Sequence, residues 1–385
     1  MFCSLRRGGH GAASGDHCNI PSGGYIFVRQ TVDQGKPTRL CARFRPAEGN
    51  HMHDTVAPAT ARCQRGTAPR SVPEARLSFT GPLPRTAVHK AADAEVLLTD
   101  ARRTGEDRFM IAALWRRDHF LRHRGADAPS DPFLLVESVR QSSILLSHRF
   151  YGIPEDHHFV LCGLDFDLEH PLPPQGGSPL PVLLDAVCVP TTGNPRRFGR
   201  RLETTVHVAG LRVGRAGLHW EAMAPKSYQR VRFRGVPTGS EGSTSEVPQV
   251  TPLPPTWVGH CHDRDVLLGR EPDGVQGPDT SWRLRMNRDH PVLFDHQSDH
   301  IPGMLLLEAF RQAALTGAPR VTGPFLRLSA TFTSFGELDR PVTLHARAAA
   351  GEAGDECRGV DVMALQEGRV LASAVVRGAG RGATC

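Results

Sequence analysis

The feature that most constrains this chain is an internal repeat. Residues 131–141 read DPFLLVESVRQ and residues 302–312 read PGMLLLEAFRQ, an offset of 171. The segments ahead of each copy repeat as well. RRDH at 116–119 matches NRDH at 287–290, and AEVLLT at 94–99 matches RDVLLG at 264–269, one residue out of step. Self-similarity at a fixed offset indicates duplicated structural units, so two homologous units of similar size are predicted.

Each copy of the repeat predicts a buried helix that carries charged side chains. The segments 131–149 and 302 to about 316 are apolar on nearly every face, which is typical of a helix inside a core. Spacings of three and four place a Glu, an Arg and a Gln on one stripe of each helix. They are Glu137, Arg140 and Gln141 in the first copy and Glu308, Arg311 and Gln312 in the second. Since a buried ion pair adds about no net stability, its appearance twice favours a functional role over an ordinary surface pair.

Length and composition indicate a protein with two cores. At 385 residues with 39% apolar content, the chain is long enough to bury both. Its longest apolar runs fall well short of the roughly 18 residues that a membrane span requires. No apolar run follows Arg6 and Arg7, so no secretory signal is predicted and we expect a cytoplasmic protein. The nine cysteines form no C-x-x-C pair, which argues against a disulfide framework or a cysteine zinc site.

The basic charge is confined to the start of the chain. The net charge is +6, and residues 1–85 contain twelve Lys and Arg against five Asp and Glu, so the other 300 residues sum to −1. Residues 1–80 are rich in Gly, Pro, Ser and Arg and lack periodicity, which predicts a disordered leader. Alternatively the true start lies downstream, with Met52 as a natural candidate. No nucleic-acid-binding motif accompanies the charge, so no such partner is expected.

The rest of the chain divides into two parallel series of elements. The first unit is predicted over residues 86–235, a linker of Gly, Ser, Thr and Pro over 236–256, and the second unit over 257–378. In each unit two short strands precede the long helix and four strands follow it. A long helix wrapped by an antiparallel sheet is the hotdog arrangement. The predicted fold is therefore α+β, a tandem hotdog in which one chain imitates a dimer.

Three segments together resemble a known family. They are DPFLLVESVRQ, HPVLFDHQSDHIPGMLLLEAFRQAA and APKSYQRVR, and the resemblance covers roughly residues 80–378. It is to the A-factor biosynthesis hotdog proteins of actinomycetes, the γ-butyrolactone autoregulator synthases. The resemblance implies transfer of a β-ketoacyl group from an acyl carrier protein or CoA thioester to dihydroxyacetone phosphate, giving a butenolide precursor, without a cofactor. The positions that match the family pattern are Glu137, Arg140, Glu308 and Arg311.

The second unit also resembles hotdog dehydratases of fatty-acid synthesis. These carry a His, a Pro-Gly turn and a helix with an acidic residue, and here His296 is followed by Pro302, Gly303 and Glu308. His296 and Glu308 are twelve positions apart, two fewer than in that pattern. A dehydratase or a thioesterase that acts on acyl thioesters remains an alternative, as does a non-catalytic protein that binds an acyl ligand.

Acyl transfer to an alcohol requires a base, oxyanion donors and a cation for a phosphate. We assign the base to Glu308, because burial raises the pKa of a carboxylate while a nearby Arg lowers it. Arg311 would hold the phosphate or the β-keto oxygen. The helix start at Gly303 would offer N–H groups to the thioester oxygen. His296, His300, Gln141 and Gln312 are further candidates for substrate binding. The DHIPG loop precedes only the second helix, so we expect a lesser role for Glu137 and Arg140.

Other interpretations of these residues remain open. Asp295, His296, Asp299 and His300 could form a metal site, although they lie in a loop and no metal is expected. His119 and His290 recur in the repeat, which suggests a turn in which the preceding aspartates bind the backbone. The basic run Lys226, Arg230, Arg232 and Arg234 is interpreted as a solvated strand face, or as a surface that docks an acidic carrier protein.

Overall fold

The computed structural model describes residues 77–121, 124–125, 127–192, 197–233, 250–270, 280–317, 320–321, 323–349 and 359–378. The predicted leader lies outside these residues up to position 76, and so does the predicted linker over positions 236–249. Residues 250–256, which we assigned to the linker, include a short strand, β7 (Thr251–Pro252), and the start of a 3-10 helix, η3 (Pro255–Val258). We call residues 77–233 the first repeat and residues 250–378 the second repeat.

The two repeats share one order of elements. The first contains η1 (Arg85–Val88), η2 (Asp93–Glu95), β1 (Leu98–Gly105), β2 (Arg108–Trp115), α1 (Pro132–Tyr151), β3 (His158–Leu168), β4 (Leu180–Pro190), β5 (Phe198–Val208) and β6 (Leu211–Met223). After η3 the second contains η4 (Asp263–Asp265), β8 (Leu268–Arg270), β9 (Ser281–Leu284), α3 (Gly303–Thr316), β10 (Phe325–Phe332), β11 (Thr343–Ala348), β12 (Gly359–Gln366) and β13 (Arg369–Gly378). Two strands, a helix and four strands occur in each, as predicted; the second repeat adds the short strand β7 at its start, and the first adds a short helix, α2 (Pro225–Arg232), at its end.

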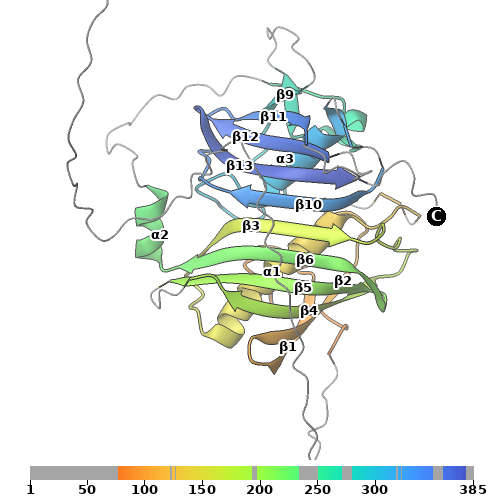
Figure 1. Ribbon diagram of the computed structural model, residues 1–385, viewed down its shortest axis with the longest axis vertical. Helices are drawn as coiled ribbons and strands as arrows, with labels where there is room; N and C mark the ends of the chain where they lie inside the picture. Colours follow the sequence, from red (N-terminus) through yellow and green to blue (C-terminus); the bar gives the residue numbers. More distant parts are fainter. Residues whose placement is uncertain are drawn as a thin grey trace, which may run out of the picture. The chain divides into compact units, whose positions relative to one another are not determined.

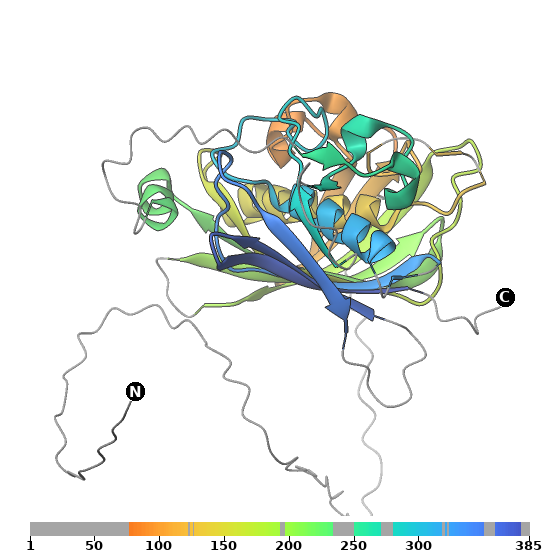
Figure 2. The same ribbon diagram turned by 90° about the horizontal axis from the view of Figure 1, so that it is seen from above.

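The thirteen strands found in the described residues belong to one antiparallel sheet. Its order is β1-β2-β4-β5-β6-β3-β10-β13-β12-β11-β9-β8-β7, so the same strand order runs outward on both sides of the central β3–β10 pair. In that pair Arg327 lies opposite Asp167 and Thr331 opposite Gly163. Figures 1 and 2 show α1 and α3 on one face of this continuous sheet. The tandem hotdog fold, with the two sheets joined edge to edge, is confirmed.

The central helices are buried because the 3-10 segments cover the side that the sheet leaves open (Figure 2). Fourteen of the twenty residues of α1 are buried, and so are eleven of the fourteen residues of α3. The predicted helix start is confirmed in α1, where the Asp131 side chain accepts the Phe133 N–H at 3.0 Å. Buried serines of α1 are satisfied by the helix itself and by tryptophans. Ser138, for example, donates to Leu134 O and accepts from Trp115 Nε1.

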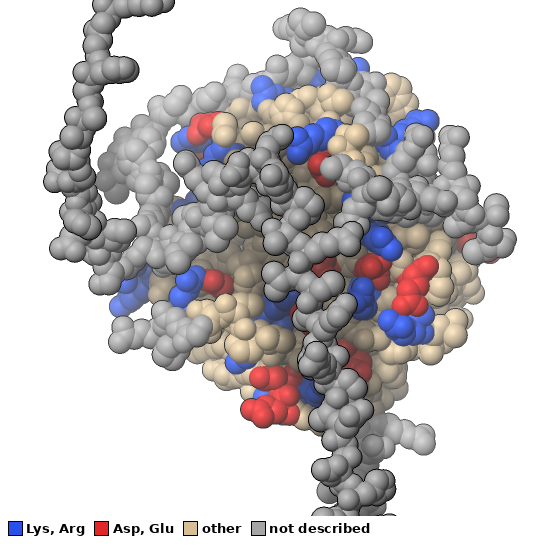
Figure 3. Space-filling model, in the orientation of Figure 1, with Lys and Arg blue, Asp and Glu red and all other residues tan. Residues whose placement is uncertain are grey.

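The opposite face of the sheet carries charged side chains of both signs (Figure 3). A shallow hollow of about 680 Å³ on this face is lined by alternating acidic and basic residues of β2–β6, β10 and β13. Several are paired across strands, such as Arg201 with Asp165 at 2.7 Å and Arg327 with Asp167 at 2.8 Å. Such exposed pairs contribute little stability. The repeated Glu, Arg and Gln residues belong to α1 and α3, which lie on the other face of the sheet.

The basic run near the end of the first repeat is helical, so our strand interpretation is wrong. Residues Pro225–Arg232 form α2, which begins with a proline at its first position. Arg232 is buried and binds Glu337 in the second repeat at 2.7 Å, while Lys226 and Arg230 are exposed. No helix within the described ranges is long and apolar enough to cross a membrane.

Candidate active site

The repeated glutamine of each central helix is a structural clamp. In the first repeat the Gln141 amide donates to Glu95 O at 2.7 Å and accepts from Leu97 N–H at 2.9 Å. In the second repeat Gln312 makes the equivalent pair of bonds, to Asp265 O and from Leu267 N–H, both at 2.8 Å. Each amide thereby fixes the segment that enters the first strand of its repeat. Substrate binding by these glutamines stays a prediction, and their backbone bonds leave little capacity for it.

The first cluster is built around Glu137, which is fully buried. Arg140 binds both carboxylate oxygens of Glu137 through Nε and Nη2, each at 2.8 Å. Gln141 donates to Oε1 at 2.9 Å, and Lys90 Nζ lies 3.2 Å from the same oxygen. The side chain of Arg140 is 19% exposed, and its Nη1 has no hydrogen-bond partner among the described residues. Arg140 can therefore present one cationic edge to a ligand.

A loop of the second repeat completes this first cluster. Lys90 Nζ also lies 3.1 Å from Asp295 Oδ2, so it bridges the carboxylates of the two repeats. The other oxygen of Asp295 accepts from His296 Nδ1 at 2.6 Å. The His296 side chain is 55% exposed. We call Lys90, Glu137, Arg140, Gln141 and Asp295 the Glu137 cluster; it lies between the repeats, with His296 at its edge.

Two further histidines border the Glu137 cluster. His89 precedes Lys90 and contacts His148 of α1, with 3.0 Å between their Nε2 atoms. Both rings pack edge-on against Phe159 of β3. Burial, together with the neighbouring His148 and Arg140, lowers the pKa of His89 to about 4. His89 is therefore neutral near pH 7 and can act as a hydrogen-bond donor or acceptor beside the cations.

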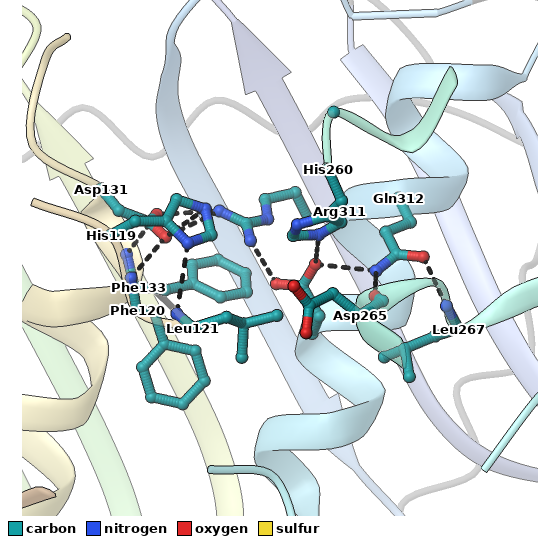
Figure 4. Close-up of polar contacts among 12 residues, drawn as sticks. His119, Phe120, Leu121, Asp131, Phe133, His260, Asp265, Leu267, Arg311 and Gln312 are labelled. Carbon is teal, nitrogen blue, oxygen red and sulfur yellow. Dashed lines mark hydrogen bonds and ion pairs between the residues drawn. The ribbon is translucent and has the colours of Figure 1, made fainter. Parts of the chain in front are cut away.

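The second cluster is built around Glu308, which is also fully buried. Figure 4 shows its partners His260, Arg311 and Gln312 beside Asp131 of the first repeat. Its Oε1 accepts from His260 Nε2 at 2.7 Å and from Gln312 at 2.9 Å, and its Oε2 accepts from Arg311 Nη2 at 2.5 Å. The Nη1 of Arg311 donates to both carboxylate oxygens of Asp131, each at 2.9 Å. We call Asp131, His260, Glu308, Arg311 and Gln312 the Glu308 cluster. Its arginine hydrogen-bonds two carboxylates, whereas the side-chain hydrogen bonds of Arg140 among the described residues are all to Glu137.

The first repeat closes the Glu308 cluster from outside. His119 lies with Nε2 3.0 Å from Asp131 and with its ring edge-on to His260, with 5.6 Å between the ring centres. Arg124 donates to Gly259 O at 2.5 Å. The side chains of Arg311 and Glu308 are 5% and 0% exposed. Within the described ranges this copy of the site is therefore enclosed, with carboxylates on both terminal nitrogens of Arg311.

The carboxylates of both clusters are ionised at neutral pH. Burial alone would raise the pKa of Glu308, but Arg311 and His260 outweigh it and lower the pKa to about 2. Burial is likewise outweighed by Arg140 and Lys90 at Glu137, and by Arg311 and His119 at Asp131, so the pKa of each lies well below its usual range. Carboxylates with such low pKa values are weak bases, which disfavours Glu308 and Glu137 as proton acceptors.

The helix that starts with Gly303 differs from α1 at its N-terminus. Pro302 occupies the cap position and no side chain caps the helix. The N–H groups of Gly303 and Met304 have no acceptor in the part of the chain that the structure describes, as is usual for a first helical turn. A Cβ at Gly303 would lie 3.1 Å from Leu161 and 3.3 Å from Phe332, which suits a residue without a side chain.

The remaining loop candidates do not gather at one point. Asp295 and His296 join the Glu137 cluster, whereas His300 and Asp299 both contact Tyr228 of α2, at 3.1 and 2.8 Å. Among the described residues no group of three or more His, Cys, Asp or Glu side chains is arranged to hold a metal ion. The aspartate of the predicted turn in the first repeat does bind the backbone, since Asp118 accepts the N–H groups of residues 124 and 125.

The sequence analysis missed the basic residue beside each glutamate. Lys90 and His260 contact Glu137 and Glu308 at equivalent places in the two repeats. The signal was present in the offset of 170 that relates AEVLLT to RDVLLG. Extended backwards, it aligns VHKAADAEVLL (88–98) with VGHCHDRDVLL (258–268) and pairs Lys90 with His260.

Comparison with known proteins adds a family match. The model of the A-factor biosynthesis hotdog domain matches residues 73–224 and 243–379. A 2-oxo-3-(phosphooxy)propyl 3-oxoalkanoate synthase of Streptomyces virginiae is 36% identical over 275 residues, which are 70% of this chain and 88% of the relative. A protein of the same name from Streptomyces griseus is 32% identical over 311 residues, 79% of this chain and 98% of the relative.

Solved structures provide a more distant likeness. The 12:0-ACP thioesterase from Umbellularia californica superposes with a TM-score of 0.41 at 11% sequence identity, covering 71% of this chain and 94% of that one. An acyl-ACP thioesterase from Bacteroides thetaiotaomicron also has a TM-score of 0.41, at 10% identity, and covers 70% of this chain and 97% of its own.

Proposed function

The chain belongs to the A-factor biosynthesis hotdog family, and we propose that it is a 2-oxo-3-(phosphooxy)propyl 3-oxoalkanoate synthase that works at the Glu137 cluster. In this reaction a hydroxyl oxygen of dihydroxyacetone phosphate bonds to the carbonyl carbon of a 3-oxoacyl thioester, and the carbon–sulfur bond breaks to release a thiol. The ester product is the butenolide precursor. The relatives share this synthase name, which favours transfer over the dehydratase, thioesterase and ligand-binding alternatives.

One observation carries the choice of cluster. Arg140 is held by a single carboxylate and keeps Nη1 without a partner among the described residues, whereas Arg311 is held by two carboxylates. A guanidinium with an open edge can bind a phosphate, and one enclosed by carboxylates cannot. This reverses our sequence-based assignment, in which Glu308 and Arg311 led the chemistry. Glu137 becomes a positioning residue that orients Arg140 and Lys90.

The acceptor phosphate would bind Arg140 Nη1. Lys90 adds a second positive charge nearby, and its two carboxylate contacts hold it in place. The neutral His89 and its partner His148 offer hydrogen bonds at the border of the same cluster. A guanidinium edge supplemented by imidazole groups suits the several oxygens of a phosphate ester.

The thioester carbonyl would lie at the start of α3. The uncapped N–H groups of Gly303 and Met304 can donate to an oxyanion there, and the helix dipole adds positive potential. This role follows the sequence prediction for Gly303. The absence of a Cβ lets Leu161 and Phe332 pack against this helix start.

We assign the base to His296. Its Nδ1 proton is held by Asp295, which leaves Nε2 as the proton acceptor on the exposed side of the ring. His296 would take the hydroxyl proton as the ester bond forms and return it to the departing thiolate. Asp295 in turn is fixed by Lys90, so the base of the second repeat is oriented by the cluster of the first.

The form of the donor and the assembly of the protein are further proposals. Either an acyl carrier protein or CoA can carry the thioester, and the exposed Lys226 and Arg230 of α2 would suit an acidic carrier. His300, bound to Tyr228 at the base of α2, is proposed to contact the donor rather than the reacting atoms. Because the two repeats already form a pseudo-dimer, a monomer is expected. The cytoplasmic location stays a prediction.

A mass-spectrometric assay tests this function. Purified protein is incubated with a 3-oxoacyl thioester, with and without dihydroxyacetone phosphate. We expect the phosphorylated ester, and release of thiol, only when the acceptor is present. Thiol release of equal rate without the acceptor would instead indicate a thioesterase, and loss of water from a 3-hydroxyacyl thioester would indicate a dehydratase.

A further inference from the structure

The two copies of the site differ at the residue that precedes each central helix. Asp131 caps α1 and Pro302 stands at the same place before α3, with similar backbone angles: φ −71° and ψ 124° against φ −61° and ψ 138°. We propose that this one position decides which copy can bind substrate. Asp131 turns the Glu308 cluster into an ion lock between the repeats, while Pro302 leaves the Glu137 cluster open. The proposal rests on the proposed function only for the identity of the bound anion.

The two-fold arrangement of the repeats places these residues opposite the two arginines. The loop ahead of α1 reaches the second repeat, where Asp131 binds Arg311 and Arg124 binds Gly259. The loop ahead of α3 reaches the first repeat in return, where Asp295 binds Lys90. From the same two-fold relation we infer that position 302 faces Arg140 as position 131 faces Arg311. Since proline has no side-chain acceptor, Arg140 has no second carboxylate at this position.

In this lock carboxylates occupy both terminal nitrogens of the Arg311 guanidinium. Arg311 donates from Nη1 to both oxygens of Asp131 and from Nη2 to Glu308. Asp131 also accepts the N–H groups of Phe120 and Phe133. The central carbon of the Arg311 guanidinium lies 4.6 Å from the ring centre of Phe133. The aromatic ring therefore covers one face of the guanidinium, while the carboxylates bind its edges. A substrate anion would have to displace a buried carboxylate to enter.

This difference explains why the same helix motif can serve two purposes. A buried arginine between two carboxylates holds elements of the two repeats together, and removing one partner leaves a buried charge unpaired. An arginine bonded to one carboxylate can still bind a ligand, but it contributes less to the contact between the two repeats. We infer that each chain has one working site, in which Pro302 is a positioning residue because it leaves the edge of Arg140 unoccupied.

A pair of substitutions at position 302 tests the inference. Pro302→Asp places a carboxylate opposite Arg140, and Pro302→Asn is the matched control of nearly the same shape without the charge. We expect the acceptor KM of P302D to exceed that of P302N by at least tenfold, with the donor KM changed by less than threefold. The urea midpoint of P302D should also lie above that of P302N, because a new ion pair joins the repeats.

The two measurements separate the inference from the proposed function. A higher urea midpoint for P302D without a change in acceptor KM would support the lock but would overturn Arg140 as the phosphate site. Equal midpoints and equal KM values for the two variants would overturn the inference itself. Asp131→Asn is the companion variant for the other copy. A lowered urea midpoint with an acceptor KM within twofold of the native value is expected, and an unchanged midpoint would contradict the lock.

Discussion

Glu308→Gln separates a structural role of the Glu308 cluster from a catalytic one. The substitution keeps the shape of the side chain and removes its charge. Interaction with Arg311 and His260 lowers the pKa of Glu308 from 4.5 to about 2 although the group is fully buried. Each pKa unit corresponds to about 1.4 kcal/mol, so the ionised carboxylate contributes about 3 kcal/mol more than a neutral group would. E308Q should lose about that much of its free energy of unfolding at pH 7.

The predicted loss is a large part of the stability of a typical domain, about 5–15 kcal/mol, so the assay has to report folding and activity together. Urea unfolding at pH 7 gives the change in stability, and turnover is measured at a low temperature where E308Q is folded. Glu367→Gln is the matched control, because Glu367 pairs with Arg340 on the surface and the two side chains are 61% and 42% exposed. The control should lose at most about 1 kcal/mol.

Turnover of folded E308Q is expected to stay within about threefold of the native value, because the Glu308 cluster is enclosed within the described ranges. A variant that unfolds like the native protein but turns over about a hundredfold more slowly would refute the reasoning. In that case Glu308 would be the base that the sequence analysis proposed, and the enclosed geometry of its cluster would not describe the working enzyme.

Three further outcomes follow from the Glu137 cluster and its surroundings. Arg140→Lys keeps the charge but loses the planar fork, so steady-state kinetics should show a rise in acceptor KM of tenfold or more with a smaller change in donor KM; equal effects on both substrates would argue against a phosphate contact. His296→Gln should lower kcat by about 10² or more while leaving the urea midpoint near native, since the side chain is half exposed; full activity would exclude it as the base. The pKa values of Glu137, Asp131 and Glu308 are lowered by folding, so the stability they supply is complete above about pH 4–5 and is lost as the pH falls towards 2; a urea midpoint that does not change between pH 6 and pH 3 would contradict these assignments.

The fold is predictable from the sequence because the repeat and the hydrophobic patterns extend over long, continuous segments of the chain. The helix over 131–149 is marked by Asp131 and Pro132, and it extends to Tyr151 in the structure. The segment Pro225–Arg232 was wrongly predicted as a strand because its many charged residues give no clear hydrophobic period. It is a helix, and its buried residues Tyr228 and Arg232 are four positions apart. Pattern alone cannot distinguish a short amphipathic helix from a strand.

The candidate site was less predictable because its parts come from different repeats. The sequence grouped His296 with Glu308, which follows it in the chain, whereas the structure connects His296 through Asp295 and Lys90 to Glu137. The two-fold arrangement brings a loop of each repeat to the helix of the other repeat. Contacts of this kind cannot be inferred from how far apart two residues lie in the sequence. The contact of Asp131 with Arg311, separated by 180 positions, is of the same kind.

Fusion of the two repeats in one chain is what permits this asymmetry. In a symmetric dimer of identical subunits, the residue before the helix is the same in both sites, so a carboxylate that locks one arginine also locks the other. A single chain can place Asp131 in one site and Pro302 in the other. It thereby gains a buried ion network that joins the repeats and keeps the arginine that we propose as the substrate site. On this reasoning a chain with aspartate at both positions should be the more stable one and inactive, and a chain with proline at both should expose two arginine edges at the expense of its interface.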